Sequence, residues 1–159
     1  MKNKQSVELC APLTGRVVPL EEVSDEAFAA KVLGDGIAVC PSEGVLRAPL
    51  DGRVDQVFET RHALTLLCAG DVELLLHVGI DTVALKGQCF ETLVTPGQRI
   101  KQGDILIRFD LNGVRAAGYD PTTPMIVSNS DDFLLTPLAD GEVRSGAPLL
   151  RLTSKKTGG

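Results

Sequence analysis

The stretch APLTGRV (residues 11–17) is repeated almost unchanged as APLDGRV (residues 48–54), and this repeat is the strongest indication of the fold. A weaker third copy, TPLADGEV, occupies residues 136–143. A second repeat relates RIKQGDILIR (99–108) to VRSGAPLLR (143–151). Proline is compatible with the start or edge of a strand, and glycine adopts the positive φ that tight turns require. We therefore interpret each repeat as a strand, a glycine turn and a second strand.

Short apolar runs lie between the repeats, at residues 36–40, 54–59, 63–68, 72–78 and 105–109. Glycine-containing turn signals separate them, which is typical of antiparallel sheets. Helix is scarce. Ser24 is expected to cap a short helix over 25–32 that ends at Gly34, and a second short helix is expected over 111–117.

These patterns predict an all-β fold, an antiparallel β-sandwich or barrel with internal strand-turn-strand repeats and one or two short helices. The length of 159 residues fits one domain. We expect that domain to span residues 9–153, with a short flexible segment over 1–8 and a flexible tail over 154–159.

The composition argues against several classes of function. The net charge is −5 and the basic residues are dispersed, so nucleic acid is not an expected partner. No secretory leader is visible, and no apolar run reaches the roughly 20 residues of a membrane-spanning helix. The four cysteines form no CxxC pair. Reduced core cysteines in a cytoplasmic protein are the expected reading.

Only two histidines are present, His62 and His77, so any imidazole chemistry involves one or both. A turn near residues 69–70 lies midway between them. If the hairpin centres there, paired residues sum to 139, and the two rings face each other across the strands. Two unrelated histidines are an equally open interpretation. A zinc site built from both histidines and Asp81 is a third, although the spacing matches no specific metal signature.

Other catalytic signatures are missing from the sequence. There is no GxxxxGK[ST] loop for a nucleotide triphosphate, no GxSxG elbow and no HExxH pair.

Several segments together resemble the glucose-type enzyme IIA domain of the bacterial phosphoenolpyruvate-dependent sugar phosphotransferase system. The resemblance runs in order from about residue 10 to residue 152. It is most specific in FETRHA (58–63) and LHVGIDTV (76–83), and it continues through LKG (85–87) and GQRIKQGD (97–104). The family fold is an all-β sandwich with a few short helices, which agrees with the fold expected from the repeats.

The resemblance implies a phosphoryl carrier, and so a phosphotransferase component. His77 would accept the phosphoryl group through Nε2 from the small carrier protein HPr and pass it to a sugar-specific IIB domain. His62 would donate a hydrogen bond to the phosphoryl oxygens, and Thr60 would orient His62. No metal or nucleotide is required, because the donor already carries an activated phosphate.

The resemblance also implies a partner-binding surface around His77. The apolar residues expected there are Phe28, Val32, Leu33, Phe58, Leu75 and Val83, and the acidic ones are Asp25 and Asp81. Three positions depart from the family pattern: Glu26 and Ala27 replace apolar residues, and Leu75 replaces an aromatic one.

An alternative role is a regulatory binding module that inhibits sugar-uptake proteins when unphosphorylated, with a zinc ion shared across the interface by His62 and His77. A zinc peptidase is excluded, because it would need more than two histidines. We expect a monomer, since a carrier presents one face to successive partners. The sugar, and whether the chain stands alone or belongs to a larger permease, are left open.

Overall fold

The computed structural model describes residues 4–157, and over this range the chain is built almost entirely of strands. The fourteen strands formed by these residues are β1 Lys4–Cys10, β2 Gly15–Pro19, β3 Asp35–Pro41, β4 Val45–Arg47, β5 Gly52–Val57, β6 Ala63–Cys68, β7 Val72–His77, β8 Phe90–Thr92, β9 Arg99–Ile100, β10 Ile105–Phe109, β11 Thr123–Val127, β12 Phe133–Pro137, β13 Glu142–Val143 and β14 Pro148–Thr157. The helices are α1 Glu26–Ala29 and α2 Leu111–Ala116, with 3-10 turns η1 Leu20–Glu22, η2 Thr82–Leu85 and η3 Ser130–Asp132.

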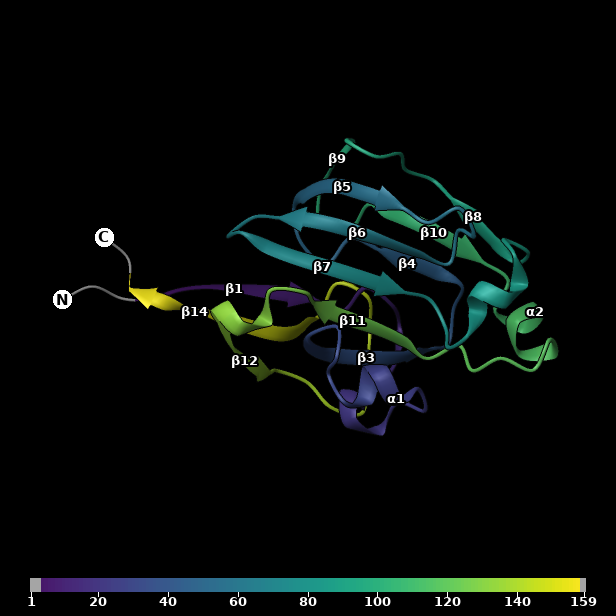
Figure 1. Ribbon diagram of the computed structural model, residues 1–159, viewed down its shortest axis with the longest axis horizontal. Helices are drawn as coiled ribbons and strands as arrows, with labels where there is room; N and C mark the ends of the chain where they lie inside the picture. Colours follow the sequence, from purple (N-terminus) through teal and green to yellow (C-terminus); the bar gives the residue numbers. More distant parts are fainter. Residues whose placement is uncertain (1–3, 158–159) are drawn as a thin grey trace.

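The strands form three antiparallel sheets (Figure 1). The largest has the order β13-β2-β3-β11-β7-β6-β5-β9, and two three-stranded sheets have the orders β1-β14-β12 and β4-β10-β8. Buried residues from all three sheets make one main hydrophobic core, including Leu9, Leu46, Leu74 and Leu152. The predicted all-β fold class is therefore confirmed, as are the strands expected at 63–68 and 105–109.

The two copies of the first repeat, 11–17 and 48–54, are joined by equivalent backbone hydrogen bonds made by the residues in and next to them. The N–H of Cys10 donates to the Pro49 carbonyl (3.0 Å), and the equivalent N–H of Arg47 donates to the Pro12 carbonyl (2.8 Å). The second repeat pairs with the first in the same way. The N–H groups of Gly146 and Gly103 donate to the Ala11 and Ala48 carbonyls, both at 2.9 Å. The duplication in sequence thus produces an internal pseudo-two-fold arrangement at the centre of the fold.

The repeat glycines serve two different purposes. Gly103 and Gly146 have positive φ, as the turn interpretation predicted. Gly15 and Gly52 do not, because they are the first residues of β2 and β5. A Cβ at Gly15 would lie 2.0 Å from the Cys40 carbonyl oxygen of the neighbouring strand. This glycine is therefore required for close strand approach rather than for a turn.

Residues near the two ends of the chain lie in paired strands. Residues 4–8 lie in β1 and residues 154–157 in β14, and these strands pair along their length, from Ser6 opposite Thr153 to Leu9 opposite Leu150. The two-stranded ribbon formed by β1 and β14 extends away from the body of the molecule (Figure 1). A flexible segment and tail were expected because these ends have few apolar residues to bury. Backbone pairing between the two ends places these residues in strands, which the sequence patterns did not indicate. The domain bounds and the flexibility expected at the ends stay predictions. Residues 1–3 and 158–159 lie outside the described range.

The first helix is shorter than expected and has another cap. Asp25 is the N-cap, and its side chain accepts a hydrogen bond from the Phe28 N–H (3.1 Å). Ser24 instead donates to the Asp120 carboxylate (3.3 Å). The helix ends at Ala29, and Lys31 then adopts φ 62°. The second helix, Leu111–Ala116, matches the prediction to within one residue.

Candidate functional site

The two histidines lie side by side at one end of β6 and β7. Their ring centroids are 4.6 Å apart and the ring planes are nearly perpendicular, at 84°. The hairpin register explains this differently from the sequence prediction. Paired residues sum to 140, with Ala63 opposite His77, because the turn spans 69–71. His62 therefore precedes β6 and is not the strand partner of His77. Its carbonyl accepts the Val78 N–H (2.7 Å), which still places the two rings together.

His77 ends β7, and a tight turn fixes the orientation of its ring. Its Nδ1 lies 2.8 Å from the Gly79 carbonyl oxygen. A carbonyl can only accept, so Nδ1 carries the proton in the neutral ring and Nε2 keeps its lone pair. This role of Gly79 was not predicted from the sequence. The only sequence signal was a glycine two residues after the histidine. It did not indicate that the glycine carbonyl points at the His77 ring.

The turn after His77 depends on glycine. Gly79 has φ 80°, and a Cβ there would lie 2.5 Å from the Thr82 Cγ2 methyl. The Thr82 hydroxyl donates to the Val78 carbonyl, and the Ile80 N–H donates to the Asp120 carbonyl (2.8 Å). Asp120 lies in the loop before β11, far from His77 in sequence, and no sequence signal connected the two. Together these bonds hold the Gly79 carbonyl against the His77 ring.

His62 is oriented by its near neighbours. The Thr60 hydroxyl lies 2.8 Å from His62 Nδ1, and this is the contact through which Thr60 would orient His62. Arg61, between them, has φ 61°, and this left-handed bend allows a residue two positions away to face the ring. The His62 side chain is almost completely covered, with 1% exposure, and no buried polar side-chain atom among the described residues lacks a hydrogen-bond partner.

Aromatic rings enclose the pair of histidines. Phe28 contacts His77 edge-on with 5.1 Å between centroids, and Phe58 contacts His62 edge-on at 5.7 Å. Phe90 was not predicted to belong to the site, and its ring centroid lies 6.4 Å from that of His62. The rings exclude water from the edges of both imidazoles, so the charged forms of the histidines are disfavoured.

The surroundings keep both histidines neutral. The pKa of His62 is lowered to about 4, mainly by burial and secondly by the neighbouring His77, while a hydrogen bond with the Thr60 backbone opposes the shift. Burial also lowers the pKa of His77, opposed by the hydrogen bond to Gly79 and by the charges of Asp25 and Asp81. A neutral His77 has an unprotonated Nε2 at neutral pH, which is the form required for nucleophilic attack.

The lowered pKa of His62 predicts a pH-dependent stability. Unfolded His62 binds a proton near its ordinary pKa of 6.5, whereas the folded residue does so only near 4. The contribution of neutral His62 to the free energy of unfolding is therefore complete above about pH 6.5 and is lost as the pH falls toward 4. Between pH 7 and pH 5, the free energy of unfolding in urea should fall more for the wild type than for His62→Gln. We expect the difference to be on the order of 1 kcal/mol after allowing for solvent screening. Equal losses would contradict the burial argument.

Four of the residues expected in the partner-binding surface are exposed. Val32, Leu33, Phe58 and Val83 are large apolar side chains with exposures of 72%, 47%, 38% and 52%. Phe28 is buried against His77, and Leu75 is partly buried against a second core cluster with Ile80 and Ile126.

The acidic residues expected in this surface have different local roles. Asp25 caps α1, and Asp81 is an exposed residue with φ 60° at the start of η2. The charges of both act on His77, which places them near its ring. Glu26 and Ala27, which depart from the family pattern, are exposed on α1.

Two further properties concern metals and membranes. Within residues 4–157, no three His, Cys, Asp or Glu side chains come together as ligands for one ion. None of the helices in this range has the length and apolarity needed to cross a bilayer.

Comparison with known proteins assigns the family. The model of the phosphoenolpyruvate-dependent sugar phosphotransferase system EIIA 1 family matches residues 7–133. A β-glucoside-specific EIIBCA component of Dickeya chrysanthemi is 48% identical over 145 residues, which are 91% of this chain and 23% of that protein. The chain thus spans about a quarter of this curated relative. The solved structure of glucose permease IIA from Mycoplasma capricolum superimposes with a TM-score of 0.88 at 35% identity, covering 92% of this chain and 96% of that one. The chain therefore belongs to the EIIA 1 family of the sugar phosphotransferase system, whose members are phosphotransferase components.

Proposed function

We propose that His77 carries the phosphoryl group of this family's relay on Nε2. The observation that supports this is the hydrogen bond between Nδ1 and the Gly79 carbonyl, which leaves Nε2 as the ring's nucleophilic nitrogen. In the first step the P–N bond of phosphorylated HPr breaks as the bond from phosphorus to Nε2 forms. In the second step, an acceptor group of a IIB domain takes the phosphoryl group and His77 returns to its starting state.

The turn after β7 would stabilise the phosphorylated ring. Once Nε2 is bonded to phosphorus and Nδ1 keeps its proton, the imidazole gains positive charge. The Gly79 carbonyl, 2.8 Å from Nδ1, accepts a hydrogen bond that becomes stronger as this charge develops. The charges of Asp25 and Asp81 act in the same direction. No nucleotide or metal is needed for these steps, because the phosphoryl group arrives activated.

His62 would stabilise the phosphoryl oxygens, with Thr60 as its positioning residue. A pKa of about 4 leaves His62 neutral, with one ring proton, at neutral pH. If the Thr60 hydroxyl donates to Nδ1, that proton is on Nε2 and can be donated to a phosphoryl oxygen. The distance of 4.6 Å between the two ring centroids leaves a group on His77 within reach of His62.

The partners follow from the family and from the surface around the site. HPr would be the donor and a IIB domain the acceptor, both binding the exposed Val32, Leu33, Phe58 and Val83 in succession. An apolar patch around a reactive group excludes water from the junction and so protects the phosphohistidine from hydrolysis. Acidic Asp25 and Asp81 would face basic residues of each partner. We propose that the chain works in the cytoplasm as a monomer. β-Glucosides are the first sugars to test, because the relative that is 48% identical is β-glucoside-specific.

A regulatory role with shared zinc is the second candidate. The Nδ1 atoms of both histidines are engaged by Thr60 and Gly79, so their Nε2 atoms are the two nitrogens available for a metal. A tetrahedral zinc site needs further ligands, and the described residues supply no third one. A zinc ion here would therefore be completed by a partner protein, with His62 and His77 as this chain's share.

Phosphoryl acceptance tests the main proposal. After incubation with phosphoenolpyruvate, enzyme I and HPr, the chain should gain about 80 Da, the mass of one phosphoryl group, in an acid-labile form. Adding a IIB domain should remove that mass. An unmodified chain in a mixture where HPr phosphorylates another IIA protein would overturn the proposal.

A further inference from the structure

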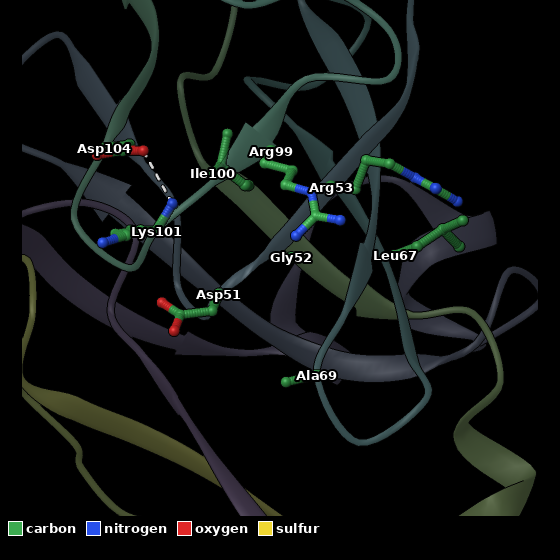
Figure 2. A pocket seen from close by; sticks show the side chains of 9 residues that line it. All are labelled: Asp51, Gly52, Arg53, Leu67, Ala69, Arg99, Ile100, Lys101 and Asp104. Atoms are coloured by element: carbon green, nitrogen blue, oxygen red, sulfur yellow. Dashed lines mark hydrogen bonds between the residues drawn. The ribbon is translucent and has the colours of Figure 1, made fainter.

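A hollow with a cavity volume of about 640 Å³ lies at the edge of the largest sheet, where β5 pairs with β9 (Figure 2). It is far from the histidine pair. Along β6, Ala63 is opposite His77, whereas Leu67, four residues on, lines the hollow. At the usual rise per residue this separates the two places by about 13 Å. The hollow is therefore not part of the phosphoryl-transfer site.

Two arginines line the hollow in an unfavourable arrangement. Arg53 of β5 and Arg99 of β9 are register partners across the antiparallel pair. Like charges directly opposite each other destabilise a sheet. The ion pairs found within residues 4–157 join Lys31 to Glu21 and Asp35, and Arg151 to Glu8. Over that range neither arginine of the hollow has a carboxylate partner that would offset the repulsion.

The acidic residues of the hollow are already engaged with backbone groups. The Asp51 carboxylate accepts the Gln102 N–H at 2.8 Å. The Asp104 carboxylate accepts the Lys101 N–H, also at 2.8 Å (Figure 2). These bonds fix the loop that carries Lys101. Three cations and two carboxylates line the hollow, an excess of one positive charge in a chain of net charge −5.

We propose that this hollow binds a small organic phosphate ester. Figure 2 shows the Arg99 guanidinium over Gly52 in the middle of the lining residues, with Arg53 and Lys101 directed to opposite sides. A guanidinium group can form two parallel hydrogen bonds to a phosphate group. The negative charge of the bound phosphate would offset the repulsion between the two arginines. Buried Ile100 and half-buried Leu67 offer an apolar floor for the carbon body of the ligand.

The shape of the site favours a soluble ligand. Its volume is within the range of small-molecule sites, roughly 300–1,000 Å³. A lipid headgroup offers the same phosphate chemistry. A bilayer, however, presents its headgroups on a flat surface, which fits a hollow less well than a soluble ligand does. The experiment therefore includes both sources of phosphate.

The test is an NMR titration of the intact chain with glucose 6-phosphate at constant ionic strength. We expect saturable shifts of the amides of residues 52, 53, 67 and 99–101, with a dissociation constant on the order of 1 mM. Inorganic phosphate should bind the same amides more weakly. Arg99→Gln should weaken binding about tenfold or more. The matched control Arg144→Gln removes an equal charge from an exposed position outside the hollow and should leave binding unchanged.

A second measurement separates lost binding from lost structure. Without ligand, Arg99→Gln should melt at the same temperature as the wild type or higher, because one of two repelling charges is gone. It should also accept a phosphoryl group on His77 normally, so failure of either proposal can be told from failure of the other.

Three outcomes would overturn the inference. One is the absence of saturable shifts, and another is shifts that sodium chloride reproduces at equal ionic strength. The third is sedimentation of the chain with phosphatidic acid vesicles when glucose 6-phosphate causes no shift.

Discussion

A chain in which glutamine replaces His77 is expected to gain no phosphoryl mass from phosphorylated HPr. The rate of acceptance should fall by on the order of 10⁴ or more, because the nucleophile itself is removed. Glutamine keeps a side-chain N–H that can donate to the Gly79 carbonyl, so the turn 78–82 should persist. The effect should therefore be chemical rather than structural.

The measurement is intact mass over time, with wild type and variant in the same mixture of phosphoenolpyruvate, enzyme I and HPr. Melting temperature and amide spectra of the unphosphorylated variant serve as controls for folding. If His77→Gln accepts the group at a rate within tenfold of the wild type, His77 is not the acceptor.

His62→Gln is expected to accept the phosphoryl group and to pass it on slowly. The final amount of phosphoryl group accepted depends on the nucleophile His77, which this variant keeps. Onward transfer depends on stabilising the charge of the departing phosphoryl group, and His62 is the ring next to His77, at 4.6 Å. Loss of one preorganised donor typically costs about 10²–10³ in rate. We expect that loss in transfer to a IIB domain, measured by quenched flow from the isolated phosphorylated chain.

Thr60 variants provide the matched control for this prediction. Thr60→Ser keeps the hydroxyl that lies 2.8 Å from His62 Nδ1 and should transfer at nearly the wild-type rate. Thr60→Val removes the hydroxyl, frees the tautomer of His62, and should slow transfer by about tenfold with an altered pH profile. Full transfer by His62→Gln, or equal rates for the two Thr60 variants, would argue against this division of roles.

Much of the fold could be predicted because the sequence repeats itself. The pair 11–17 and 48–54 indicated duplicated strand-turn-strand units, and the structure pairs them through equivalent hydrogen bonds. The sequence did not reveal which glycines serve turns and which serve close contacts. Gly15 needs the second property because of Cys40, a residue on another strand. The terminal ribbon was missed for the same reason, since pairing between residues 4–10 and 148–157 is remote in sequence.

The proximity of the two histidines could be predicted from the sequence, but the strand register on which that prediction rested was wrong by one residue. Scarcity of histidine drew attention to His62 and His77, and the hairpin between them implied proximity. The register is shifted by one residue, so His62 reaches His77 from just outside β6. The helix cap also changed place: Asp25, rather than Ser24, accepts the Phe28 N–H, because Ser24 bonds to Asp120. Such choices depend on partners brought in by tertiary structure, which local signals do not contain.

NMR of the phosphorylated chain, labelled with ¹⁵N in histidine, would identify the nitrogen that carries the phosphoryl group. Long-range correlations between ring nitrogens and carbon-bound ring protons identify the substituted nitrogen, and comparison with His62→Gln identifies the residue. We expect phosphorus on Nε2 of His77, with Nδ1 of that ring still protonated toward Gly79. Phosphorus on Nδ1 of His77, or on either nitrogen of His62, would contradict this prediction.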